Sequence, residues 1–196
     1  TLHNTLFPYT TLFRSGITPR FIEVDRVSPM TFRSLDVGVV MDMMIHDLDI
    51  VLMLMGAPLS RVEAAGIAVI SDREDVANAR LVFENGGVAN LTASRLALKT
   101  ERKLRLFSES AYVSLDYQKR NGLVIRAADN AEALTRLRQQ LAEGNDLSDL
   151  DYSQLVQVDE LTMELPEGEQ DPLTAQLSSF LKAARGETCE GVDAQA

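Results

Sequence analysis

The sequence predicts an α+β fold in which a large, mostly antiparallel open sheet carries helices on one face. Three observations lead to this prediction. Several short stretches have the alternation typical of strands, most of them follow one another in hairpin order, and one long apolar helix precedes most of them. The chain of 196 residues has room for one domain of ordinary size, or slightly more.

The first part of the chain predicts one strand and the long helix. Arg20–Val27 alternates apolar and polar residues, as a half-buried strand does. After a loop, residues 37–55 are almost wholly apolar and predict a helix. Gly56 and Pro58 follow, and because both residue types stop helices, the helix is expected to end there.

The rest of the chain predicts short strands and two further helices. Strands are expected at residues 61–70, 76–83, 88–96, 103–107, 112–117, 123–127 and 155–165. The run at 84–87 (Glu-Asn-Gly-Gly) predicts a hairpin turn, because Asn and Gly accept positive φ. Residues 131–142 and 172–185 are expected to be helical, the second closed by Gly186, and 143–153 to be an acidic connector.

The face of the sheet opposite the helices predicts a partner. Alternating strands place Val, Leu and Ala side chains on that face as well. A broad uncovered apolar face is stable when a second copy of the chain covers it. We therefore expect a homo-oligomer that assembles through the open sheet face.

Composition and charge exclude several classes of protein. The formal net charge of −10 argues against binding to nucleic acid. The longest apolar run, 37–55, is interrupted by three aspartates and a histidine, so no membrane span is expected. The single cysteine, Cys189, excludes an intrachain disulfide and a multi-cysteine metal site, and suits the reducing cytoplasm. The eleven glycines fit neither G-x-G-x-x-G nor the P-loop pattern, so no dinucleotide cradle is expected in this chain.

The helix at 37–55 carries the residues that point to chemistry. Asp42, His46 and Asp49 are spaced i, i+4 and i+7 and therefore share one helical face. An imidazole and two carboxylates in such apolar surroundings are costly unless they are paired or face a polar cleft. Three interpretations stay open: a hydrogen-bonded core pair without chemistry, a metal site, and general acid–base catalysis. The metal site is the weakest of these, because no further strong ligand is evident.

Three segments in order resemble the glucose–fructose oxidoreductase/inositol dehydrogenase (Gfo/Idh/MocA) family. They are the D-x-x-x-H motif at 42–46, the hairpin at 78–95 and the late helix at 171–186. The resemblance implies that residues 16–196 are the substrate-binding and oligomerisation domain, with a dihydrodipicolinate-reductase-like C-terminal fold and no Rossmann domain. Further stretches resemble the branch that oxidises the 3-hydroxyl of a UDP-N-acetylhexosamine with NAD in lipid A synthesis. These stretches are residues 21–26, 42–49, 75–80 and 90–95.

The resemblance also implies roles for individual residues. His46 would be the acid–base that takes the hydroxyl proton as hydride leaves for NAD or NADP. Asp42 would hold the sugar hydroxyls or orient His46. Further candidate substrate ligands are Asp49 and, for the diphosphate, Arg26, Arg33 and Arg95. For each arginine, a surface position or a partnership with a nearby acid is the competing interpretation.

The resemblance is incomplete at both ends of the chain. The family uses a lysine in a Glu-Lys-Pro motif, which does not occur here. Residues 1–15 contain a near repeat (TLFPY, TLFRS) without helical or strand period, and are expected to be a non-native leader. We expect the natural protein to continue at both ends, with the cofactor-binding half elsewhere. The chain alone is then predicted to bind no NAD or NADP and to be inactive.

Two other functions fit the same pattern. A non-catalytic oligomerising or binding module would keep the fold, with Asp42 and His46 buried and bonded to each other. A hydrolase or lyase of the same family would use the cofactor transiently and release no reduced nucleotide, so product analysis separates it from a dehydrogenase.

Overall fold

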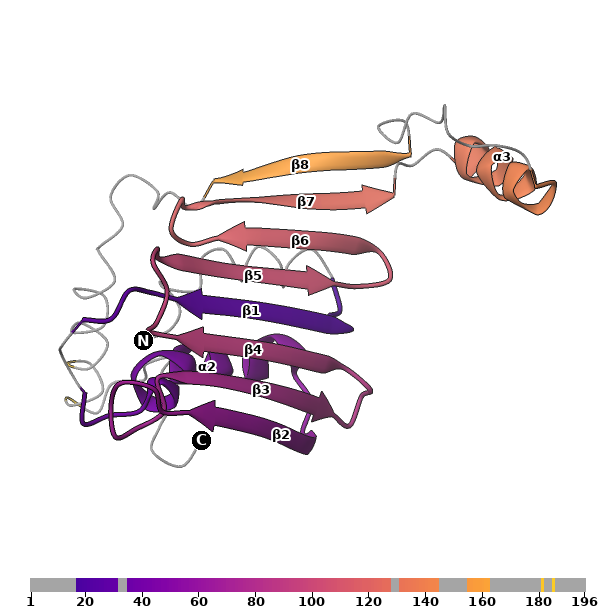
Figure 1. Ribbon diagram of the computed structural model, residues 1–196. Coiled ribbons are helices and arrows are strands. Elements are labelled where there is room, and N and C mark those ends of the chain that lie inside the picture. Colours follow the sequence, from indigo (N-terminus) through magenta and orange to yellow (C-terminus); the bar gives the residue numbers. More distant parts are fainter. Residues whose placement is uncertain are drawn as a thin grey trace. The chain divides into compact units, whose positions relative to one another are not determined.

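In the computed structural model, the described residues are 17–31, 35–127, 131–144, 155–162, 181 and 185. They form one eight-stranded sheet with the order β2-β3-β4-β1-β5-β6-β7-β8 (Figure 1). The strands are β1 (Phe21–Val27), β2 (Leu59–Ile67), β3 (Val76–Phe83), β4 (Val88–Ser94), β5 (Glu101–Phe107), β6 (Ala111–Asp116), β7 (Asn121–Ala127) and β8 (Val156–Thr162). The helices are the π-helix η1 (Val40–Met44), α2 (Ile45–Met55) and α3 (Ala131–Ala142). The predicted α+β class with a large open sheet is confirmed.

The mostly antiparallel character of the sheet is confirmed, with one exception. β1 lies between β4 and β5 and runs parallel to β4, whereas every other neighbouring pair is antiparallel. Ile22 and Val24 of β1 are 0% and 4% exposed, as expected for a central strand. Hairpin order could not predict this position, because β1 pairs with residues far along the chain, for example Phe21 with Val88.

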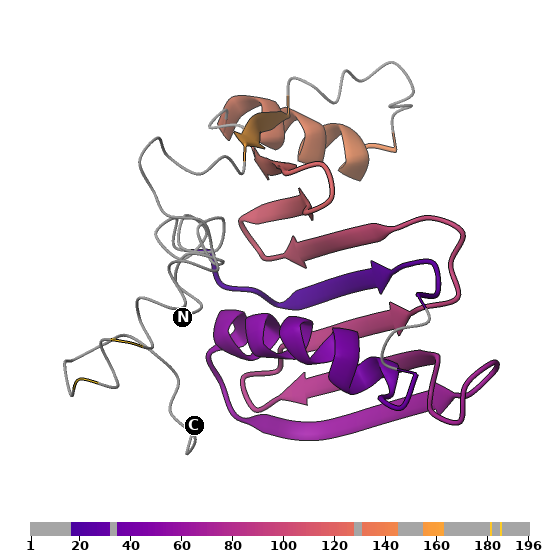
Figure 2. The same ribbon diagram turned by 90° about the vertical axis from the view of Figure 1, so that its left-hand side faces the viewer.

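The long helix lies across one face of the sheet (Figure 2). It begins at Val40, later than the predicted residue 37, and its first turn is η1 rather than α-helix. It ends where the sequence predicted, at Gly56, which has a left-handed φ of 56° and donates its N–H to the Leu52 carbonyl. Its buried side chains are Met44, Asp47, Val51, Leu54 and Met55. The helix contacts β4, which places the core between them.

Most other predicted elements agree with the structure to within a few residues. β3 and α3 have the predicted bounds, and β2 begins and ends slightly earlier than predicted. The β3–β4 hairpin turns through Gly86, which has a φ of 78°. The predicted helix at 172–185 and the predicted connector at 143–153 lie almost wholly outside the described residues.

The face opposite α2 is divided into rows by the cross-strand register. One row is apolar across seven strands and consists of Val82, Val88, Phe21, Phe107, Tyr112, Ile125 and Val158. The next row is mostly polar and includes Arg80, Asn90, Glu23, Arg105 and Ser114. The sequence predicted Val, Leu and Ala side chains on this face, but the four alanines of β3 and β4 are buried on the helix side, because they occupy the inward positions of the alternation. They are Ala77, Ala79, Ala89 and Ala93.

Candidate functional site

The helix formed by η1 and α2 presents the predicted polar trio away from the sheet. Asp42 and His46 are exposed, and Asp49 is half-buried. Within the part of the chain that the structure describes, no side chain or backbone group bonds to the side chains of this trio. The imidazole and the Asp42 carboxylate are therefore accessible. This differs from the buried and mutually bonded pair that a non-catalytic module predicts.

The π-helix lies directly at the trio. Each N–H of a π-helix bonds to the carbonyl five residues earlier, so its turn is wider than an α-helical turn. Asp42 is in the middle of η1, and His46 is the second residue of α2. The two residues stay one turn apart on the outward face, as the spacing predicted. Single π turns occur frequently at functional sites.

A buried ion pair determines which way this helix faces. Arg26 from β1 and Asp47 from α2 are 9% and 5% exposed. Arg26 donates from Nε to Asp47 Oδ2 and from Nη2 to Oδ1, each at 2.5 Å. Asp47 follows His46 in sequence and points about 100° further round the helix. Because Asp47 is held against the sheet, His46 is turned toward solvent.

Apolar side chains flank the trio on the outward side of the helix. Met41, Ile45 and Leu52 are 62%, 39% and 42% exposed. The surface thus combines an imidazole and carboxylates with apolar area. Ligand sites commonly combine apolar lining with a few placed polar groups. This combination suits a sugar ring, which has hydroxyl groups at its edge and C–H groups on its faces.

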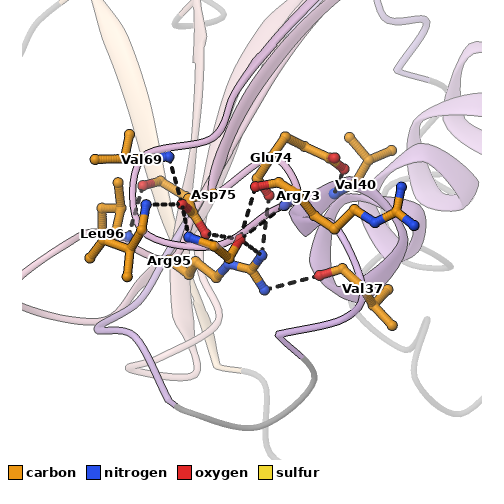
Figure 3. Close-up of polar contacts among 11 residues, drawn as sticks. Val37, Val40, Val69, Arg73, Glu74, Asp75, Arg95 and Leu96 are labelled. Atoms are coloured by element: carbon orange, nitrogen blue, oxygen red, sulfur yellow. Dashed lines mark hydrogen bonds and ion pairs between the residues drawn. The ribbon is translucent and has the colours of Figure 1, made fainter.

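Arg95, which follows β4, is buried among internal acceptors (Figure 3). It is 3% exposed, and its Nε donates to Asp75 Oδ1 at 2.8 Å. Its Nη1 donates to the Val37 carbonyl at 3.0 Å. Its Nη2 donates to Ser71 Oγ at 3.0 Å and to the Glu74 carbonyl at 3.4 Å. The guanidinium is therefore used to join three parts of this chain.

Two of the three arginines predicted as diphosphate ligands are thus engaged elsewhere. Arg26 and Arg95 are partners of buried acids, which is the competing interpretation that the sequence left open. Both guanidinium groups face the interior, because a buried carboxylate without a partner is costly. Arg33 lies outside the described residues. Asp42, His46 and Asp49 are the predicted site residues that the structure brings together.

The acids that hold the site were not among the predicted site residues. The signal for Asp47 was available in the sequence, because a charge that lies off the polar face of an apolar helix needs a partner. For Asp75 no pattern was available. Its ligands come from a turn and from Arg95, twenty residues along the chain.

Asp75 makes the stability of the fold sensitive to acid. The N–H groups of Ile70, Val69 and Ser71 hold the pKa of Asp75 far below its usual range, against the opposing effect of burial. The folded state therefore keeps this carboxylate ionised at pH values where the unfolded chain, with an ordinary Asp pKa of about 3.9, takes up a proton. The contribution is complete above about pH 4 and is lost as the pH falls from there toward the folded pKa.

Asp75→Asn is expected to flatten the decline of the free energy of unfolding between about pH 4 and pH 2, since the group that titrates only in the unfolded state is removed. Urea denaturation of the wild type and the variant at several pH values measures this. Asp72→Asn, in the same turn and exposed, is the matched control. Parallel curves for wild type and Asp75→Asn would contradict the prediction.

Two searches of the described residues bear on other classes of function. None of the helices in the described ranges is long and apolar enough to cross a membrane. Among the same residues, histidine, cysteine and acidic side chains form no group of three or more that could hold a metal ion.

Comparison with known sequences identifies the domain. Residues 18–114 match the GFO/IDH/MocA C-terminal domain. Over 99 residues, the chain is 46% identical to the UDP-N-acetylglucosamine 3-dehydrogenase of Acidithiobacillus ferrooxidans, a match that covers 50% of this chain and 32% of that protein.

Comparison with solved structures agrees. The dehydrogenase GnnA from Acidithiobacillus ferrooxidans superposes with a TM-score of 0.71 and 29% identity, over 95% of this chain and 53% of that chain. An oxidoreductase domain protein from Kribbella flavida shares the fold, with a TM-score of 0.67 and 14% identity over 95% of this chain and 55% of that chain. The chain spans about half the length of these proteins. Through its residues 18–114, the chain belongs to the GFO/IDH/MocA C-terminal domain family.

Proposed function

We propose that this chain is the substrate-binding part of an NAD(P)-dependent sugar dehydrogenase that oxidises the 3-hydroxyl of a UDP-N-acetylhexosamine. The observation that carries the proposal is the exposed pair of Asp42 and His46, on a helix that Asp47 ties to the sheet through its ion pair with Arg26. Similarity to UDP-N-acetylglucosamine 3-dehydrogenase supports the class of substrate.

His46 acts as the acid–base at the reacting hydroxyl. A neutral imidazole nitrogen accepts the hydroxyl proton as the carbon is oxidised, and returns it in the reverse direction. Asp42, one turn earlier, accepts a hydrogen bond from the imidazole N–H or from a sugar hydroxyl, and so orients the group it contacts. Asp49, on the same face, supplies a further acceptor for sugar hydroxyls.

The nicotinamide cofactor, when bound, takes the hydride from the sugar carbon. The outward helix face does not fit the dinucleotide phosphates, because it carries carboxylates, one imidazole and apolar side chains. The guanidinium groups of Arg26 and Arg95 are engaged with internal acids. We therefore assign the sugar ring to this face, and the phosphates of the dinucleotide and of UDP to residues outside this face.

A direct test uses the whole protein with UDP-N-acetylglucosamine and NAD. We expect reduced nucleotide to accumulate, together with a sugar product that has lost two hydrogens by mass spectrometry. A changed sugar without net reduced nucleotide would indicate the hydrolase or lyase alternative. No reaction with any UDP-N-acetylhexosamine, with either NAD or NADP, would contradict the proposal.

We also propose that the protein forms a homo-oligomer through the face opposite α2. In the apolar row, the ring centroids of Phe21 and Phe107 lie 5.5 Å apart, and those of Phe107 and Tyr112 5.0 Å apart. In the neighbouring rows, Arg105 lies 3.4 Å from both Glu23 and Asp25. The face therefore offers apolar area and charges of both signs, which a second copy can match about a two-fold axis.

Phe107→Glu is expected to convert the oligomer to a monomer at micromolar concentration, because it places a charge in the centre of the apolar row. Light scattering coupled to size exclusion measures the mass. Leu98→Glu is the control, since that side chain is 100% exposed in a loop. An unchanged mass for Phe107→Glu rules out assembly through this face.

A further inference from the structure

The turn between β2 and β3 is built round a fully buried carboxylate (Figure 3). Asp75 is 0% exposed. Its Oδ2 accepts the N–H groups of Val69, Ile70 and Ser71 at 2.8, 2.7 and 3.1 Å. Its Oδ1 accepts the Ser71 hydroxyl at 2.7 Å and Arg95 Nε at 2.8 Å. With both oxygens used in this way, the turn has a single well-determined shape.

The same network reaches the backbone at the start of the candidate catalytic helix. The Val39 N–H donates to the Glu74 carbonyl at 2.9 Å, and the Val40 N–H to Glu74 Oε1 at 3.3 Å. The first N–H groups of a helix have no partners within it, and a carboxylate is favourable at this positive end. Gly38 leaves room for this contact, since a Cβ there would lie 1.9 Å from Glu74 Oε1.

Asp42 lies between two anchors on the helix. Upstream, the backbone at Val37–Val40 is tied to Glu74 and Arg95. Downstream, Asp47 is tied to Arg26. The turn between them is the π-helix, which buries Met44 toward the sheet and, among the described residues, has no side-chain hydrogen bond on its outward face. The upstream anchor therefore sets where Asp42 stands relative to His46.

We propose that Arg95 is a positioning residue: through Asp75 and the Val37 carbonyl, it holds the start of the helix so that Asp42 stands correctly for the reaction. The effect of Arg95 on the reaction rests on the proposed function, whereas its hold on the start of the helix does not. Arg95 does not touch the substrate, because its guanidinium is buried and bonded internally.

The structural consequence is tested by hydrogen–deuterium exchange on the whole protein. Arg95→Lys keeps the positive charge beside Asp75 but loses the fork, so one ammonium cannot serve Asp75, Val37 and Ser71 together. We expect faster exchange of the amides at 37–44, with β5 and β6 unchanged. Arg126→Lys is the control. Arg126 on β7 pairs with Asp159 on β8 at 2.6 Å, near the opposite edge of the sheet. Unchanged exchange at 37–44 in Arg95→Lys overturns the proposal, whether or not the protein is a dehydrogenase.

The catalytic consequence is tested by a double-mutant cycle with Asp42→Asn. Small misplacements of catalytic groups are costly, so Arg95→Lys is expected to lower kcat/KM on the order of 10- to 100-fold. In the Asp42→Asn background, the same change is expected to cost less than about 3-fold, because residues that act through one another are not additive. Equal effects in both backgrounds would show a general loss of folded protein and overturn the positioning role.

Glu74→Ala gives the same test from the other side of the network, should Arg95→Lys fail to fold. It removes the side-chain contact to the Val40 N–H and leaves the Asp75–Arg95 pair intact. We expect the same local exchange and the same loss of additivity with Asp42→Asn. If the wild type shows no dehydrogenase activity but amide exchange at 37–44 is faster in the variants than in the wild type, the proposed function fails. The role of the network in anchoring the start of the helix then stands.

Discussion

His46→Ala is expected to lower kcat of the whole protein by about 100-fold or more, the scale on which loss of a general base acts. The reason is chemical rather than structural. The side chain is exposed and has no bonding partner among the described residues, so its removal leaves the packing of the helix unchanged. The melting temperature is therefore expected to stay within about 1–2 °C of the wild type.

Added imidazole provides the sharper measurement. Because the position of His46 is open to solvent, free imidazole can enter the space left by the alanine and restore part of the activity. Lys119→Ala, an exposed substitution in the β6–β7 turn, controls for a surface change and is expected to leave kcat unchanged. A kcat of His46→Ala close to that of the wild type would remove the acid–base assignment.

Arg26→Met is expected to destabilise the fold by about 3–5 kcal/mol, the range for breaking one half of a buried ion pair. The substitution leaves the Asp47 carboxylate buried without its two charged donors. The helix must then either unfold locally or rotate to bring Asp47 to solvent, which would turn His46 away from its present direction. Urea denaturation measures the change in the free energy of unfolding.

Two further variants separate the effect of leaving a buried charge unpaired from the effect of lost side-chain packing. Arg26→Met combined with Asp47→Leu removes both charges together, and is expected to recover most of the stability, since apolar replacements of buried pairs are often neutral. Arg105→Met breaks a half-exposed pair on the opposite face of the sheet and is expected to cost at most about 1 kcal/mol. A cost below about 1 kcal/mol for Arg26→Met would show that the pair does not hold the helix.

Local elements were predictable because their signals are short in range. The alternation in β1 and β3, the Gly-rich turn before β4 and the helix stop at Gly56 each depend on residues within a few positions of one another. The shared face of Asp42 and His46 is of the same kind, since helical periodicity alone places residues four apart on one side.

The π turn and the direction of the helix could not be predicted in this way. The pattern of 37–55 specifies a helix that is apolar on most sides, so several rotations on the sheet bury similar areas. The contact that selects one rotation is Arg26–Asp47, which joins a central strand to the helix. Its existence depends on β1 entering the sheet beside β4, a pairing across a long stretch of chain.

The residue pattern by itself determined the class of fold, the approximate bounds of most elements and the shared helical face of Asp42, His46 and Asp49, because periodicity and turn chemistry act locally. The tertiary structure alone decided the roles of the arginines. Arg26 and Arg95 are of a residue type that commonly binds anions. Each, however, lies beside a buried acid that folding brings to it from a distant segment. A buried carboxylate needs a charged partner, because water cannot reach it to replace that partner. Burial, rather than residue type, therefore determined the function of both arginines.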